Sequence, residues 1–249
     1  MKIIVSPDYQ HQKEWIQQVP HLFAAGGGEL LYKGRNQVRL FMVGGEKLVV
    51  KRYKRNDVIK SLIYTFFRKS KARRSYDNAV ALRLRGFQTP REVACIEQTR
   101  MGFVTQVFYI CAYTEKQPVR PRLIEQEPFD KPLAIAYARY VSSLHEAGVL
   151  HCDLNPTNVL VDSNFHFELI DINRMKFYDG PVPKAECMEN LTLFYWLTPA
   201  YRFILDEYAR QRGWTSDDIA EAIRVKERHD KRWILRKKIT HFGRYEVLR

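Results

Sequence analysis

Short apolar runs separated by turn residues fill the first part of the chain and predict an antiparallel sheet. The paired glycines Gly44-Gly45 are typical of a hairpin between two such runs. The expected strands are Glu29–Tyr32, Gln37–Val43, Lys47–Tyr53, Arg91–Gln98 and Phe103–Tyr113.

Helical periodicity replaces this pattern elsewhere along the chain. In the segment Ser70–Arg85, Ala72, Tyr76 and Leu84 share one face, and Gly86 follows as a stop. The other expected helices are a short one around Gln12–Gln18, then Lys131–Ala147, Cys187–Leu197, Pro199–Arg212 and one that begins at Thr215. Strands followed by helices predict an α+β protein.

Residues 148–174 carry the pattern that most directly indicates chemistry. Two apolar segments, 158–161 and 165–170, are joined by a turn at residues 162–164. Asp153 and Asn158 stand before the first segment, and Asp171 follows the second. We expect a short hairpin that brings these three side chains together. Turn formation alone explains any one of these residues, but poorly explains their order and spacing.

Phosphoryl transfer from a nucleotide needs such a set: a carboxylate to orient the attacking hydroxyl, and a carboxylate and an amide to hold Mg2+. The pattern from His151 through Asp153 to Asn158, with Asp171 later, resembles the catalytic core of the protein-kinase-like superfamily. The resemblance implies ATP and Mg2+ as cofactors. Asp153 is the expected base, and Asn158 and Asp171 are the expected metal ligands.

The same resemblance predicts a bilobed protein-kinase-like fold over residues 1–249. It places an antiparallel-sheet N-lobe with one main helix in residues 1–113 and a mainly helical, reduced C-lobe in residues 114–249. Lys51, on an apolar strand, would hold the α- and β-phosphates, although a lysine at a strand end is more often simply solvated.

Further nucleotide contacts are expected from the N-lobe. The turn Gly34, Arg35 and Asn36 would cover the phosphates, and adenine would bond to the backbone between Cys111 and Tyr113. Asp77 is the acid in the helix 70–85, so it is the candidate partner of Lys51, where the superfamily usually has the longer Glu.

Composition fits a globular protein, with 45% hydrophobic and 13% aromatic residues. The four cysteines include no C-x-x-C pair, which argues against a zinc site or a disulfide framework. No apolar run is long enough for a membrane span. We therefore expect a cytoplasmic protein. Its net charge of +13 predicts an anionic partner.

One basic region favours an anionic membrane surface as that partner. Residues 47–74 contain eleven Lys or Arg and one acid, around an apolar cluster at residues 62–67. Such a composition suits docking on acidic lipid, although a charge-rich segment is more often a solvated face. The tail, residues 224–249, has ten Lys or Arg against three acids.

Several departures argue against an ordinary regulated protein kinase. No A-P-E segment follows Arg174, and Asn173 replaces the glycine of the D-F-G motif. Cys152 stands where kinases regulated by activation-loop phosphorylation carry Arg, and Asn155 stands where many have Lys.

Taken together, the segments resemble the bacterial lipopolysaccharide kinase family. The segments that carry the resemblance are Lys33–Asn36, Val49–Arg52, Lys71–Tyr76, Gly86–Pro90, His151–Asn158 and Leu169–Arg174. The resemblance implies an anionic glycolipid substrate, with transfer of the γ-phosphoryl group of ATP to a Kdo or heptose hydroxyl of the lipopolysaccharide inner core. It also implies action at the cytoplasmic face of the inner membrane.

Alternative functions remain open at this point. An atypical small Ser/Thr protein kinase would use the same residues, and a catalytically silent kinase fold would dock on RNA or a membrane. Aminoglycoside-type phosphotransferases share the motif but act on cationic acceptors, which suit a charge of +13 poorly. No recognised RNA motif with interleaved aromatics is present, so no nucleic acid is expected.

Overall fold

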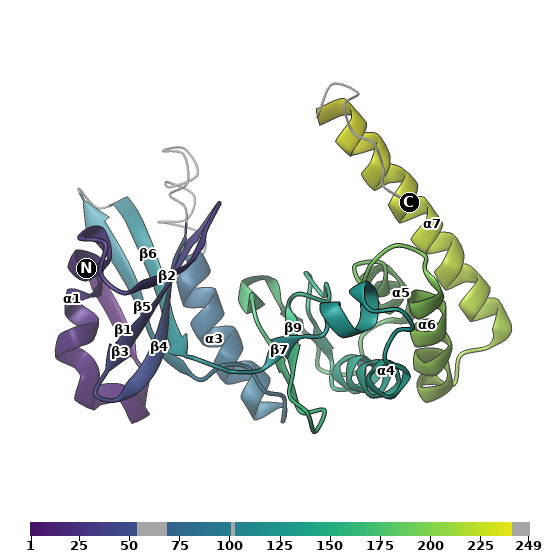
Figure 1. Ribbon diagram of the computed structural model, residues 1–249, viewed down its shortest axis with the longest axis horizontal. Coiled ribbons are helices and arrows are strands. Elements are labelled where there is room, and N and C mark those ends of the chain that lie inside the picture. Colours follow the sequence, from purple (N-terminus) through teal and green to yellow (C-terminus); the bar gives the residue numbers. More distant parts are fainter. Residues whose placement is uncertain (54–68, 101–102, 241–249) are drawn as a thin grey trace. The chain divides into compact units, whose positions relative to one another are not determined.

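The computed structural model describes residues 1–53, 69–100 and 103–240, and it consists of two compact units (Figure 1). The first unit comprises Met1–Glu115 with Glu168–Arg174, and the second comprises Lys116–Phe167 with Met175–Arg249. The sequence predicts a boundary after residue 113, two residues earlier. It also predicts that residues 168–174 belong to the second lobe, whereas they cluster with the first unit.

The first unit is built on a six-stranded sheet with the order β1-β5-β6-β4-β3-β2, and the neighbouring strands pair antiparallel. Its strands are β1 (Lys2–Val5), β2 (Glu29–Lys33), β3 (Gln37–Val43), β4 (Glu46–Tyr53), β5 (Glu92–Arg100) and β6 (Phe103–Ala112). Its helical segments are η1 (Pro7–Gln12), α1 (Lys13–Ala24), α3 (Lys71–Leu84) and η3 (Ile172–Arg174).

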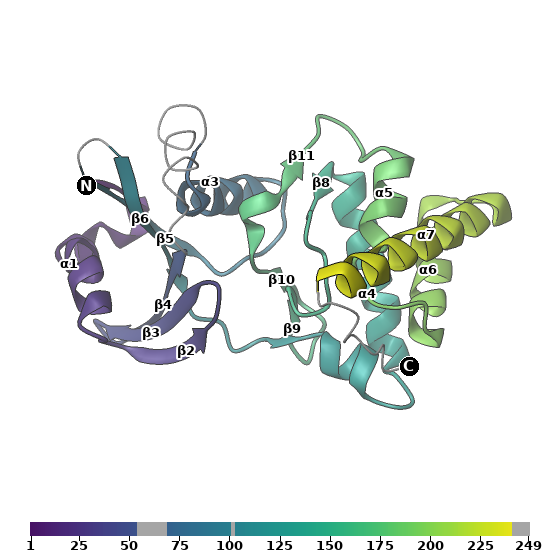
Figure 2. The ribbon, with the colours of Figure 1, turned by 90° about the horizontal axis from the view of Figure 1, so that it is seen from above.

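Helices α1 and α3 lie on opposite faces of this sheet (Figures 1 and 2). Because consecutive strand residues point to opposite faces, β4 sends Leu48 and Val50 into the core under α1, and Tyr53 into the core under α3. The same alternation separates Lys51 from its neighbour Arg52. Lys51 therefore shares the α3 face, and Arg52 shares the α1 face.

Two elements of this unit exceed what the sequence predicts. Helix α1 continues to Ala24, well beyond the predicted end at Gln18, and its buried residues Ile16, Val19 and Phe23 cover one sheet face. Strand β1 is not predicted at all, since a four-residue run gains its stability from pairing with distant β5.

The second unit is mainly helical. Its helices are η2 (Pro121–Glu125), α4 (Lys131–Glu146), α5 (Lys184–Leu191), α6 (Pro199–Arg212) and α7 (Ser216–Thr240). Its short strands are β7 (Gln117–Pro118), β8 (Val149–Leu150), β9 (Val159–Val161), β10 (Phe167–Leu169, which the division between the units crosses) and β11 (Lys176–Phe177). They form the sheets β10-β9-β7 and β11-β8.

Helix α4 delivers the chain directly to the loop with Asp153. Asp130 caps its start, where its carboxylate accepts the amide of Leu133 at 2.9 Å. Gly148 follows its end with φ of 70°, and a Cβ there would lie 2.5 Å from the carbonyl oxygens of Tyr178 and Gly180. Glycine is therefore required at this connection.

A buried chain of hydrogen bonds supports the same loop from three helices. Tyr208 of α6 contacts His145 Nδ1 of α4 at 2.8 Å, and His145 Nε2 contacts Asn190 Oδ1 of α5 at 3.1 Å. Asn190 Nδ2 donates to the carbonyl of His151 at 2.9 Å. Because Asn190 Nδ2 is the donor to the loop, the atom of Asn190 that faces His145 is the acceptor Oδ1. His145 Nε2–H therefore donates to Asn190 Oδ1, and the Tyr208 hydroxyl donates to His145 Nδ1. This arrangement needs a neutral His145.

Burial lowers the pKa of His145 from 6.5 to about 4. Because the pKa is lower in the folded chain than in the unfolded one, protonation favours unfolding. We expect the free energy of unfolding to fall as the pH drops below 6.5 and to level off below about 4, a total loss of ~3 kcal/mol. Urea unfolding at several pH values, followed by tryptophan fluorescence, measures this.

Two variants make the measurement specific. His145→Gln should reduce the dependence on pH, whereas His166→Gln, at an exposed position, should keep it. Equal pH dependence in the wild type and His145→Gln would contradict the assignment.

Candidate active site

Lys51 is held in place by a carboxylate that lies 120 residues away in the sequence. Its ammonium donates to Asp171 Oδ1 at 2.7 Å and lies 5.1 Å from the ring centre of Tyr53. Both side chains of the ion pair are partly buried, at 20% and 32% exposure. The predicted phosphate-binding lysine and the predicted metal ligand are therefore neighbours within the first unit.

The backbone at Asp171 adopts an uncommon conformation. Its φ of 55° lies in the left-handed region, which Asp tolerates better than most residues. Asn173 Nδ2 donates to Asp171 Oδ1 at 2.7 Å, and Asn78 of α3 donates to the carbonyl of Ile172 at 2.7 Å. Local strain retained by surrounding hydrogen bonds is typical of functional sites.

The predicted pairing of Lys51 with Asp77 is not present. The Asp77 carboxylate instead accepts from Lys69 and from Arg73, both at 2.7 Å. One helical residue corresponds to a rotation of ~100°, so Asp77 and Asn78 face different ways. Asn78 faces the segment that contains Asp171, whereas Asp77 pairs with Arg73 on its own helix and with Lys69 just before that helix.

Lys71 lies among other cations and is also close enough to Asp171 for their charges to interact. The pKa of Lys71 is lowered by burial and by the nearby charges of Arg35, Arg174 and Arg74, while Asp171 opposes this shift. Such mutual repulsion of cations is relieved by a polyanion. Lys71, Arg74 and Arg174 belong to segments that carry the family resemblance, but the sequence assigns them no role, because those segments are separate along the chain.

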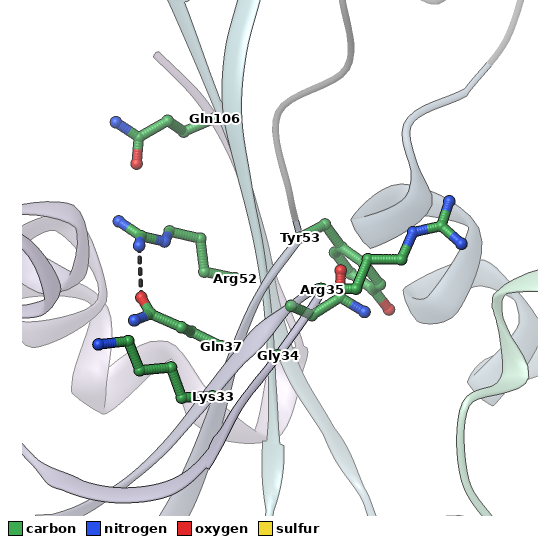
Figure 3. Close-up of a pocket in the computed structure, with 8 residues that line it drawn as sticks. Lys33, Gly34, Arg35, Gln37, Arg52, Tyr53 and Gln106 are labelled. Carbon is green, nitrogen blue, oxygen red and sulfur yellow. Dashed lines mark hydrogen bonds between the residues drawn. The ribbon is translucent and has the colours of Figure 1, made fainter. Parts of the chain in front are cut away.

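The predicted phosphate-covering turn lies between β2 and β3. Gly34 N donates to Asn36 O at 3.0 Å, which closes the turn. The turn borders a hollow of about 460 Å3. In Figure 3, Arg35 points with Tyr53 toward the α3 face, the side of the sheet that carries Lys51.

The backbone predicted to bind adenine is partly used by the sheet. The amide of Ala112 donates to Arg91 O at 2.8 Å, and the amide of Tyr113 donates to Lys47 O at 2.9 Å. These two donors are therefore not available to adenine, and a contact through carbonyl groups of this stretch stays a prediction. Burial raises the pKa of the Cys111 thiol to about 12, so the thiol stays protonated.

The loop with Asp153 has its own network in the second unit. Asn155 Nδ2 donates to Asp153 Oδ1 at 3.1 Å, and Asp153 N donates to His151 Nδ1 at 3.2 Å. Asn158 Nδ2 donates to Asp153 O at 2.9 Å, so its other amide atom is an oxygen acceptor. Asp153 and Asn158 thus share one ordered loop.

Asp171 belongs to the first unit, whereas Asp153 and Asn158 belong to the second. A site with all three side chains would need both units, so the convergence of these residues stays a prediction.

The sequence also raises the questions of a metal-binding cluster and of a membrane-spanning helix. Among the described residues, no three or more His, Cys, Asp or Glu side chains gather as a metal site. No helix within the described ranges is long and apolar enough to cross a membrane. The apolar cluster at residues 62–67 lies outside the described residues.

Comparison with known proteins supplies independent information. The model of the lipopolysaccharide kinase (Kdo/WaaP) family matches residues 32–225. A 3-deoxy-D-manno-octulosonic acid kinase of Photobacterium profundum is 28% identical over 171 residues, which cover 66% of this chain and 72% of the relative.

Among solved structures, WaaP in complex with acyl carrier protein matches with a TM-score of 0.63 at 19% identity. The match covers 93% of this chain and 99% of the other, and it supports the kinase-like α+β fold. The family model spans well over half of the chain. The chain therefore belongs to the lipopolysaccharide kinase (Kdo/WaaP) family, and it is an ATP-dependent kinase of a lipopolysaccharide core sugar.

Proposed function

We propose that this kinase transfers the γ-phosphoryl group of ATP to a hydroxyl of Kdo in the lipopolysaccharide inner core. The observation that carries the assignment of the site is the Lys51–Asp171 ion pair at 2.7 Å, set among cations. The choice of Kdo over heptose is supported by the 28% identical relative, which is named as a kinase of this sugar.

Lys51 holds the α- and β-phosphates in this proposal, and Lys71, Arg35 and Arg174 offset the remaining negative charge. Asp171 and Asn158 offer a carboxylate and an amide oxygen, the hard oxygen donors that Mg2+ prefers. When bound, Mg2+ neutralises charge that develops on the phosphates. Two protein ligands are enough for this ion, which usually keeps several waters.

Asp153 orients the sugar hydroxyl and accepts its proton. Asn155 supports this role, since its amide holds one oxygen of the Asp153 carboxylate at 3.1 Å. Asn190 holds the loop from beneath through the carbonyl of His151. The base is thus oriented by the neutral amide of Asn155, and its loop is held by the neutral amide of Asn190.

An anionic membrane at the cytoplasmic face is the proposed location of the acceptor. Lys226 anchors α7 to the chain that follows α5, because its buried ammonium donates to Thr192 O at 3.1 Å. Asp230 Oδ1, on the same helix, accepts from this ammonium at 2.6 Å. Further along α7, Leu235 and Ile239 are exposed at 59% and 68%. Basic residues flank them on this helix: Arg232, Arg236, Lys237 and Lys238. This combination suits contact with acidic lipid.

Replacing Asp153 tests the proposed base. Asp153→Ala should lower phosphate transfer from labelled ATP to Kdo-terminated lipid A precursor by about 10²–10⁴-fold, because general-base assistance is lost. ATP binding should remain, and Asp162→Ala, in the hairpin turn, should keep activity. Label on heptose-extended acceptor alone would exclude Kdo, and label on protein alone would favour an atypical protein kinase.

The two aspartates considered as neighbours of the nucleotide lysine can be separated. Asp171→Ala should abolish Mg2+-dependent ATP binding, whereas Asp77→Ala should change the dissociation constant by no more than about twofold. Equilibrium binding of a fluorescent ATP analogue with and without EDTA measures both. Normal Mg-ATP binding by Asp171→Ala would remove the metal assignment.

Asn190 is proposed as a positioning residue for the loop. Asn190→Ala removes the hydrogen bonds to the His151 carbonyl and to His145 Nε2, and these lost buried hydrogen bonds correspond to about 1–3 kcal/mol. We expect kcat to fall about tenfold or more while KM for ATP changes little. Asn164→Ala, in an exposed turn, is the matched control. A changed KM with an unchanged kcat would contradict the role.

A further inference from the structure

The α1 face of the first unit carries a second group of cationic and amide side chains. Figure 3 shows Lys33, Gln37, Arg52 and Gln106 pointing to the side of the strands opposite to Tyr53 and Arg35. They come from four neighbouring strands, β2, β3, β4 and β6. Strand register pairs Lys33 with Gln37, and Gln37 with Arg52.

Helix α1 ends beside these residues. Its last buried side chain, Phe23, lies 4.9 Å from the guanidinium carbon of Arg52 and 5.4 Å from that of Arg39. Beyond Phe23 the same sheet face carries polar side chains, and the hollow of about 460 Å3 opens there. The strand ends therefore form a polar recess beside the hydrophobic core under α1.

The lining of this hollow has a uniform charge. Its described residues are Lys33, Gly34, Arg35, Asn36, Gln37, Arg52, Tyr53 and Gln106, with no acid among them. Two of its cations, Lys33 and Arg52, point to the α1 face, whereas Arg35 points to the opposite face. Within the described ranges, no carboxylate forms an ion pair with Lys33 or Arg52. Uncompensated cations in a recess attract an anion.

The side chain of Arg52 is also preorganised for binding. Its guanidinium lies against the ring of Phe23 and donates to Gln37 Oε1, so two of its contacts limit its rotation. A guanidinium keeps further N–H donors in a planar fork that matches phosphate oxygens. The amides of Gln37 and Gln106 add neutral donors at the edges.

We propose that this recess binds the phosphate group of a phosphorylated ligand, at a site separate from the Lys51–Asp171 pair. Its volume suits a sugar phosphate or a lipid phosphate headgroup. This phosphate site does not depend on the identity of the acceptor sugar. Arg52 points to the face of β4 opposite to Lys51, away from the residues proposed for phosphoryl transfer.

Consecutive residues of β4 provide the test. Binding of glucose 1-phosphate by calorimetry should weaken about tenfold or more in Arg52→Gln, because a charge-assisted pair is lost. It should persist in Lys51→Met. Arg202→Gln, at an exposed position of α6, controls for net charge.

A second variant avoids any loss of packing at Arg52. Gln106→Glu places a carboxylate at an exposed position of the recess and should weaken binding similarly, whereas Gln18→Glu on α1 should not. In a parallel arm, flotation with phosphatidylcholine vesicles, with and without phosphatidic acid, distinguishes lipid phosphate from soluble phosphate.

The outcomes are distinct. If Arg52→Gln and Gln106→Glu weaken the binding of glucose 1-phosphate in calorimetry, the ligand is a soluble phosphorylated molecule. If they weaken only the flotation with phosphatidic acid vesicles, the ligand is a lipid phosphate. If Arg52→Gln and Gln106→Glu behave like their controls in both arms, or if Lys51→Met removes binding, the proposal is overturned.

Discussion

The ion pair between Lys51 and Asp171 is the interaction on which the organisation of the first unit depends. It ties β4 to a segment 120 residues later, which clusters with this unit and not with the chain that surrounds it. A partly buried ammonium or carboxylate without its partner would be costly. Each charge therefore keeps the other in place, and further hydrogen bonds from Asn173 to Asp171 and from Asn78 to the Ile172 carbonyl hold the segment.

The fold was largely predictable because its signals are local. Strand β3 and helix α6 have the predicted bounds, Gln37–Val43 and Pro199–Arg212, since periodicity and flanking turn residues define them. Helix α1 was underestimated, and β1 was missed. Both are stabilised by strands that are distant in the sequence, since α1 packs on one face of the sheet and β1 pairs with β5, and no local window of the sequence contains these contacts.

In the candidate site, too, the sequence predicts contacts within one segment better than contacts between distant segments. The pattern from His151 to Asn158 is contiguous, and the structure gives it one hydrogen-bonded loop. The partner of Lys51 was predicted wrongly, because helical periodicity indicates a face but not which of Asp77 or Asn78 lies on it. Asn190 and His145 were missed as supports of the loop, since their contacts join three helices.

Strand alternation also explains how a strongly basic protein can keep its cations in separate roles. On β4 the ammonium of Lys51 meets Asp171 on the α3 face, while the guanidinium of Arg52 meets Phe23 and Gln37 on the α1 face. The sheet between them is filled by buried apolar residues such as Val50 and Phe108. An anion on one face therefore does not neutralise the other face by contact. The net charge of +13 is better understood as distinct basic surfaces, each of which selects its ligand by geometry, than as one uniform attraction.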